Sequence, residues 1–145
     1  MTTVAPAVNG RLIALAHHSA RALVEAALAR HDVTFHQGVT LRAVTVAGGS
    51  LARDELVAEV THSLKTDPSV VHGAIDELTR AELLVREGSL LHLTDAGRDL
   101  YDTTAAATAQ ISARLYAGIP AEDLTVAGRV LTLLTERANA ELTGS

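Results

Sequence analysis

One stretch decides the fold of this chain: residues 83–100, LLVREGSLLHLTDAGRDL. Two short apolar runs, 83–85 and 90–93, flank a turn that contains glycine, and this pattern predicts a small β-hairpin. A Thr-Asp pair follows at 94–95, and both residue types favour the N-cap of a helix. The apolar positions then recur at helical spacing, so we expect a long helix over about 96–117.

The segments outside this stretch repeat apolar positions at the 3.6-residue spacing of amphipathic helices. Asp67 before Pro68 is typical of a helix start, because a carboxylate caps free N–H groups and proline fits the first helical position. The glycines at 48–49 indicate a loop. We therefore expect helices over residues 9–30, 34–46, 53–64 and 68–81, and a last one from Pro120 to about 142.

The composition excludes several classes of protein. With 145 residues, 48% hydrophobic and 20% charged content, the chain can bury a core, and its length fits a single domain. No apolar run approaches the roughly 18 residues of a membrane span, and the first residues lack a signal-peptide pattern, so we expect a cytoplasmic protein. The absence of cysteine excludes disulfides, thiolate metal sites and cysteine nucleophiles.

Several segments together resemble the MarR family of winged-helix regulators. They are DPSVV at 67–71, Ile75-Asp76 with Leu78, Leu83-Leu84, and LTDAGRDL at 93–100, which is the family's strongest signature. The resemblance implies a mainly α fold with a small β-hairpin, forming a homodimer with a small-molecule pocket between its DNA-reading and dimerisation parts. The implied parts are a winged helix-turn-helix over about 34–95 and dimerisation helices over about 9–30 and 96–142.

The DNA-reading residues of that family are largely replaced here. Where the family has arginines in its recognition helix, this chain has His72-Gly73 and Glu77, its wing turn is only REGS at 86–89, and Glu82 replaces a glycine. Residues 67–87 carry two basic and five acidic side chains, a net charge of −3 out of −5 for the chain. DNA affinity depends on Lys and Arg, so this balance argues against strong binding. If the chain binds DNA, we expect contacts from Ser69, Val70, His72, Gly73, Arg80 and Arg86.

The seven histidines include the best candidates for chemistry, because imidazole titrates near neutrality and serves as acid, base or ligand. His17 and His18 lie within about one turn of Arg21 on the expected first helix. In the MarR family this part of the helix helps to line the ligand cavity, where His36 and Gln37 would face it. We expect these residues to bind an anionic or phenolic ligand, with Arg21 holding the negative charge and a histidine moving a proton.

A less specific interpretation fits the same histidines. A lone histidine on a helix is more often a hydrogen-bonded surface or interface residue than a catalyst. No two histidines are spaced four apart, so no helix face offers a ready pair of metal ligands. We expect neither a metal nor a cofactor.

Two functions follow from these observations. The main hypothesis is a MarR-type homodimer repurposed away from sequence-specific DNA binding. It binds a small aromatic or anionic molecule, or acts as an acid/base enzyme of specialised metabolism with His17 and His18 as catalytic residues. The alternative is a ligand-responsive, DNA-binding transcriptional regulator, in which residues such as Arg53 take over phosphate contacts. The sequence leaves open whether the chain is an enzyme.

Overall fold

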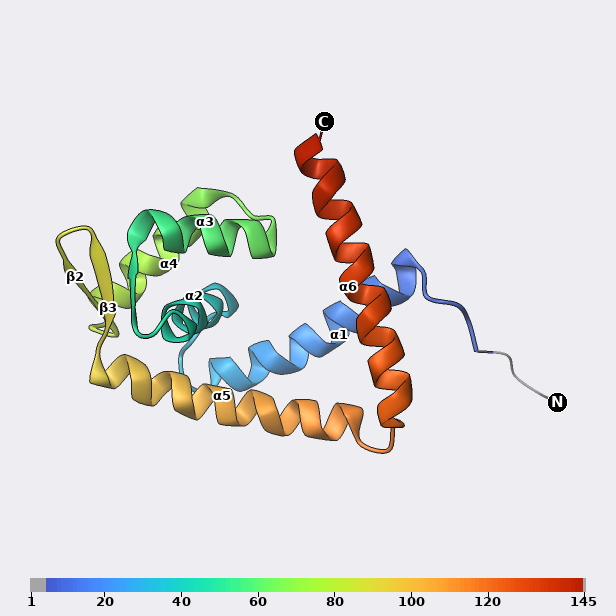
Figure 1. The fold of residues 1–145 in the computed structure, drawn as a ribbon. Helices are drawn as coiled ribbons and strands as arrows, with labels where there is room; N and C mark the ends of the chain where they lie inside the picture. The colour runs from blue at the N-terminus through green and yellow to red at the C-terminus, as the bar shows by residue number, and fades with distance from the viewer. Residues whose placement is uncertain (1–4, 145) are drawn as a thin grey trace. The chain divides into compact units, whose positions relative to one another are not determined.

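The structure is a computed structural model that describes residues 5–144 (Figure 1). It divides into two compact units, one ending at Ile111 and one beginning at Ser112. In chain order the elements are α1 (Gly10–Ala29), α2 (Phe35–Val46), β1 (Ser50–Ala52), α3 (Arg53–Leu64), α4 (Pro68–Arg80), β2 (Leu84–Glu87), β3 (Leu90–Leu93), α5 (Asp95–Tyr116) and α6 (Ala121–Gly144).

Local capping explains where the first helices begin. The side-chain oxygen of Asn9 accepts a hydrogen bond from the backbone N–H of Leu12 at 2.9 Å and starts α1. Thr34 and Gln37 form a capping box at the start of α2, in which each side chain accepts from the other residue's backbone N–H, at 3.2 and 3.1 Å. The predicted helices are confirmed, and α6 begins directly after Pro120.

The wing is an antiparallel sheet with the strand order β1-β3-β2. The predicted hairpin is confirmed as β2 and β3, in which Leu84 pairs with Leu93. The prediction of a loop after α2 is wrong at the end of that loop. Residues 50–52 form β1, in which Leu51 pairs with Leu91 of β3. So short a strand has no periodic pattern of its own, and it depends on a partner far along the chain.

The joint between the wing and α5 gives a physical reason for the sequence at 93–100. The hydroxyl of Thr94 donates to the carbonyl of Glu82 at 2.8 Å and accepts from the backbone N–H of Gly97 at 3.0 Å. Gly97 is buried against the carbonyl of Leu83, and a Cβ at this position would overlap that oxygen. Glycine therefore lets α5 start this close to the backbone that follows α4.

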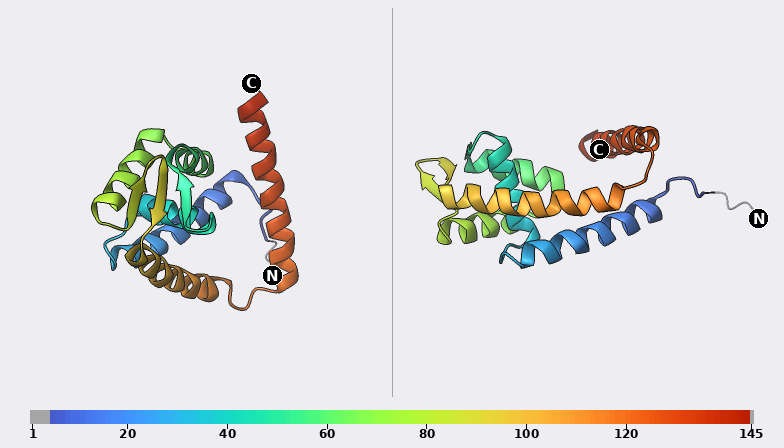
Figure 2. Two further views of the ribbon diagram at one scale, coloured as in Figure 1. Left: turned by 60° about the vertical axis from the view of Figure 1, so that its left-hand side comes forward. Right: turned by 90° about the horizontal axis from the view of Figure 1, so that it is seen from below.

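The core of the first unit lies where α2, α3 and α4 gather beside the sheet (Figure 2). Burial of its aliphatic side chains is the main stabilising contribution to the fold. Because α4 directs its apolar positions into this core, its opposite face is left exposed. The buried core residues are Leu41, Val44, Leu56, Val60, Val71, Ile75, Leu78, Leu84 and Leu91.

Helices α1 and α6 expose several apolar side chains each. Among the described residues, α6 buries none, and its exposed apolar positions include Leu131, Leu133 and Leu134. Helix α1 buries only Leu28 and exposes Leu15 and other apolar residues. Despite this apolar character, no helix within residues 5–144 is long and apolar enough to cross a membrane.

Candidate functional site

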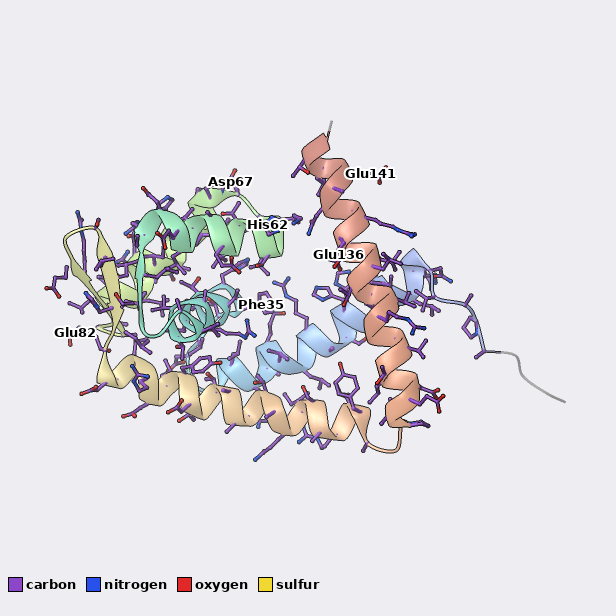
Figure 3. The ribbon with its side chains drawn as sticks, viewed as in Figure 1. Phe35, His62, Asp67, Glu82, Glu136 and Glu141 are labelled. Atoms are coloured by element: carbon purple, nitrogen blue, oxygen red, sulfur yellow. The ribbon has the colours of Figure 1, made fainter. Side chains whose placement is uncertain are left out.

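The exposed face of α4 is the candidate DNA-reading surface. Ser69, Val70 and Gly73 are exposed on this helix, and His72 is half-buried. A Cβ at Gly73 would meet no atom within 4 Å, so this glycine leaves a gap in the face and serves no contact with the core. Asp67 caps the helix (Figure 3), and the backbone N–H of Ser69, which donates to its carboxylate at 2.9 Å, lowers the pKa of that carboxyl.

Arg53, the first residue of α3, holds two side chains of α4. Its Nη2 donates to Oδ1 of Asp76 at 2.9 Å, and its Nε donates to Nδ1 of His72 at 3.1 Å. The hydrogen bond from Arg53 is the main reason that the pKa of Asp76 lies below its usual value. This carboxylate on the candidate surface is therefore paired within the protein.

Three arginines surround a hollow between α4 and the wing. Arg53, Arg80 and Arg86 line it with Asp76, Thr79 and Leu91, and its volume is about 350 Å³. Because one carboxylate faces three guanidinium groups among these lining residues, the hollow attracts anions. Guanidinium groups bind phosphate oxygens well, so this arrangement can hold a phosphate of a DNA backbone. The structure thus brings together Arg53, Arg80 and Arg86, all three of which were candidate DNA contacts from the sequence.

The carboxylates of Glu77, on α4, and Glu82, just after it, lie in different surroundings. Nε2 of Gln37 donates to Oε2 of Glu77 at 3.3 Å, so the second carboxylate of α4 is also tethered. Glu82 lies between α4 and β2 (Figure 3) with a φ of 61°, in the left-handed region that favours glycine. Glu82 therefore adopts a backbone conformation suited to glycine and adds a negative charge.

The predicted ligand residues of α1 and α2 lie partly around one hollow of about 450 Å³. His17, Arg21 and His36 line it together with Phe35 and residues 63–66 at the end of α3. Lys65, within that last segment, lines the hollow as a second basic side chain besides Arg21. We call this space the basic hollow, and its charge suits an anion.

Two of the predicted ligand residues are not among those lining the basic hollow. His18 is exposed on α1, with its ring centre 5.3 Å from that of His17. The side chain of Gln37 instead joins the capping box of α2 to Glu77. Arg21 itself is engaged, because its guanidinium lies 4.0 Å from the centre of the Phe35 ring and 3.5 Å from the carboxylate of Glu25.

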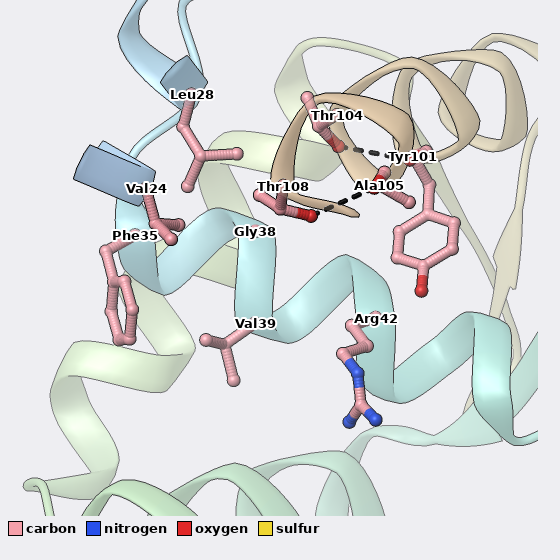
Figure 4. A pocket seen from close by; sticks show the side chains of 10 residues that line it. All are labelled: Val24, Leu28, Phe35, Gly38, Val39, Arg42, Tyr101, Thr104, Ala105 and Thr108. Atoms are coloured by element: carbon pink, nitrogen blue, oxygen red, sulfur yellow. Dashed lines mark hydrogen bonds between the residues drawn. The ribbon is translucent and has the colours of Figure 1, made fainter. Parts of the chain in front are cut away.

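A second, more apolar cavity of about 250 Å³ lies between α1, α2 and α5 (Figure 4). Its walls include Leu28 from α1, Phe35 and Val39 from α2, and Tyr101 from α5, with Arg42 as its charged lining residue. Phe35 borders both this apolar cavity and the basic hollow. Apolar walls with one guanidinium group suit an aromatic molecule that carries a negative charge.

Sequence reasoning missed several residues that line these spaces. Phe35 offered a signal, since it is the chain's single phenylalanine and precedes His36. No sequence signal pointed to Arg42 or Lys65, because helical periodicity does not show which exposed basic residue faces a cavity. Within residues 5–144, no group of three or more His, Asp or Glu side chains is arranged to hold a metal ion.

Comparison with known proteins gives matches in structure and none in sequence. No protein-family model and no curated protein matches the chain. Many solved structures do match its fold, and they include MarR-family transcriptional regulators. The chain therefore has the MarR-type winged-helix fold, mostly helical with a small antiparallel sheet.

Three of these solved structures illustrate the likeness. CouR from Rhodococcus jostii RHA1, bound to p-coumaroyl-CoA, is 23% identical with a TM-score of 0.75, and the match covers 87% of this chain and 90% of that one. A MarR-family transcriptional regulator from Rhodococcus sp. RHA1 is 22% identical with a TM-score of 0.73, covering 87% and 91%. BpsR from Bordetella bronchiseptica, whose DNA binding is regulated by 6-hydroxynicotinic acid, is 21% identical with a TM-score of 0.72, covering 88% and 93%.

Proposed function

We propose that this chain is a ligand-responsive transcriptional regulator that binds DNA as a homodimer. The observation that carries the proposal is the hollow lined by Arg53, Arg80 and Arg86 beside the exposed face of α4. Arginine contacts to phosphates supply much of the affinity for DNA and fix the register of a recognition helix in the groove. The similar regulators support the same function, since the DNA binding of one of them responds to a small molecule.

The acidic residues of α4 are the main objection to DNA binding, and the ion pair of Asp76 weakens it. Asp76 accepts from the guanidinium of Arg53, whereas Glu77 accepts from the neutral amide of Gln37, which brings no balancing cation. A carboxylate whose charge is balanced by a neighbouring cation repels phosphate less than an unpaired one. The net charge of residues 67–87 therefore overstates the repulsion, because it leaves out Arg53.

The same geometry gives less support to an acid/base enzyme of specialised metabolism. His17 and His18, the catalytic residues of that hypothesis, are both exposed on α1. General acid–base groups work best when burial and fixed neighbours tune their pKa and hold them against the substrate. We therefore favour the regulator.

Titration of duplex DNA from the region upstream of the chain's own gene, at low and at raised salt, tests the proposal. We expect sequence-dependent binding that weakens with salt, and replacing Arg80 by Met should reduce the slope of log K against log salt by about 1. Arg30→Met, an equal loss of charge at the end of α1, serves as the control. Weak binding that is the same for all sequences would contradict the regulator.

The ligand we propose is a small aromatic molecule with a negative charge. The apolar cavity supports the aromatic part through Phe35 and Tyr101, and Arg42 supports the charge. The basic hollow, with Arg21 and Lys65, is the second possible place for the anionic group. A similar fold holds p-coumaroyl-CoA, a molecule with an aromatic ring and a strongly anionic part, in CouR.

Thermal unfolding with 4-hydroxycinnamate and with its uncharged amide tests this ligand class. A ligand that binds only the folded state stabilises it by RT ln(1 + [L]/Kd). At equal concentration, the more tightly bound carboxylate should therefore raise Tm more than the amide. Loss of the effect in Arg42→Met, with the effect kept in Arg21→Met, would assign the ligand to the apolar cavity. Equal shifts for both compounds would exclude a role for the negative charge.

The exposed apolar surfaces of α1 and α6 support the homodimer. Helix α6 exposes Leu131 and Leu134, and α1 exposes Leu15 and Leu23. Large exposed apolar patches usually mark protein interfaces, and we propose that a second copy covers these helices in the cytoplasm. Sedimentation equilibrium should give twice the chain mass of 15.1 kDa, whereas a monomer at all concentrations would contradict the dimer.

A further inference from the structure

We propose that His72 recognises a guanine in the DNA site through its Nε2–H, and that Arg53 is the positioning residue that places the proton there. The inference rests on the proposed DNA binding. It goes further by assigning His72 as the residue that contacts a base, guanine as that base, and Arg53 as the residue that positions His72.

The proton of His72 is placed by its neighbour. A neutral imidazole has one N–H donor and one nitrogen that accepts, and either nitrogen can carry the hydrogen. Arg53 has only donors, and its Nε lies 3.1 Å from Nδ1 of His72 in donor geometry. Nδ1 must therefore accept, and the hydrogen of the neutral ring is on Nε2.

Arg53 is itself held in place. Its Nη2 donates to Asp76 at 2.9 Å, so the guanidinium joins Asp76 and His72, which lie one turn apart on α4. Within residues 5–144, Nε2 of His72 has no hydrogen-bond partner in the protein. The hydrogen bonds that join Asp76, Arg53 and His72 thus hold the imidazole in place and leave its Nε2–H donor unused.

The position of His72 suits contact with bases. It is the fifth residue of α4, in the half of a recognition helix whose side chains approach base edges. The next residue, Gly73, leaves a gap that lets the helix backbone come close to DNA. The hollow of Arg53, Arg80 and Arg86 lies on the same side and can fix the helix against the phosphates.

Chemistry of the major groove selects the base. Guanine presents two neighbouring acceptors there, N7 and O6, whereas adenine places an N–H₂ donor beside its N7. Cytosine presents a donor, which a second N–H donor would face unfavourably. A fixed N–H donor therefore rejects cytosine and prefers guanine, with its two neighbouring acceptors, over adenine and over thymine, whose single acceptor O4 lies beside a methyl group.

Selection of duplexes from a random pool tests the inference in the full-length protein. The wild type should enrich guanine at one position of each half-site, and His72→Ala should lose this preference by about tenfold while other positions stay selective. His72→Gln should shift the same position towards adenine, because the side-chain amide of glutamine donates to N7 of adenine and accepts from its N6–H₂. A merely structural histidine would not produce such a switch.

Two charge-matched variants separate positioning from general affinity. Arg53→Met should weaken the guanine preference at that position, because Nδ1 is no longer held as an acceptor. Arg80→Met, with the same loss of charge, should lower affinity for all sequences and leave the preference intact. Thermal unfolding checks that each variant is folded.

The outcomes are distinct. An unchanged set of base preferences in folded His72→Ala overturns the role of His72, and an unchanged preference in folded Arg53→Met overturns the role of Arg53. If the wild type enriches no sequence, the proposed DNA reading and this inference both fail.

Discussion

The side-chain amide of Gln37 donates to the carboxylate of Glu77 at 3.3 Å and joins the start of α2 to the exposed face of α4. The residues just before it, Phe35 and His36, line the basic hollow. A ligand that displaced the first turn of α2 would therefore act on α4 through one side chain. This gives the proposed ligand response a physical route, with the same residue holding the capping box of its own helix.

Gln37→Ala should destabilise the fold, because it removes both the capping-box partner of Thr34 and the tether to Glu77. Loss of a helix cap costs about 1 kcal/mol, so we expect Tm to fall by a few degrees. Thermal unfolding measures this, with Gln110→Ala on the exposed face of α5 as the matched control. Equal effects of the two substitutions would show that the contacts of Gln37 contribute nothing.

The pair of Arg53 and Asp76 should make stability depend on pH in acid. The folded-state pKa of Asp76 lies below its ordinary value of 3.8, chiefly because of the hydrogen bond from Arg53. Its contribution to the free energy of unfolding is therefore fully present above that ordinary value, and it is lost as the pH falls through the folded-state pKa. Asp76→Asn should be less stable than wild type near neutrality, with a difference that shrinks in acid.

Urea unfolding across the acid range measures that difference, and Asp99→Asn, at an exposed position of α5, is the control. A destabilisation by Asp76→Asn that is the same at neutral and acid pH would mean that the ionised carboxylate does not carry the effect.

Glu82→Gly should stabilise the protein and strengthen DNA binding. At a φ of 61° a side chain costs about 1 kcal/mol or more, and the greater freedom of glycine in the unfolded chain offsets part of the gain. Glu82→Ala keeps the strained backbone and removes the same carboxylate. Only the glycine variant should therefore gain stability in urea unfolding, while both gain DNA affinity at low salt. A glycine variant less stable than wild type would contradict the strain.

The fold could be predicted further than the site, for a physical reason. Caps such as Asp67 and Thr94 act on residues within a few positions, so helix starts are visible in the sequence. The pairing of Arg53 with Asp76 joins residues 23 positions apart, and nothing in either segment indicates it. The net negative charge of residues 67–87 could be counted in the sequence, but the pairing of Asp76 with a cation could not. The ligand-binding roles of His17, Arg21 and His36 stay predictions.

Two glycine substitutions should change stability in opposite directions. Gly97→Ala places a Cβ onto the carbonyl of Leu83, and relieving that overlap must move α5 away from the wing. Overpacking of this kind costs about 2–4 kcal/mol, and the shift also strains the hydrogen bonds of Thr94. Gly73→Ala meets open space and should raise stability by up to about 1 kcal/mol, because alanine favours the helix.

The pair also separates folding from DNA binding. If α4 needs the gap at Gly73 to approach the bases, Gly73→Ala should weaken DNA binding although it stabilises the fold. Urea unfolding and DNA titration of the same preparations test both effects. Improved stability together with unchanged DNA affinity would show that close approach at Gly73 is not needed. Equal stability changes for Gly97→Ala and Gly73→Ala would contradict the contact with Leu83.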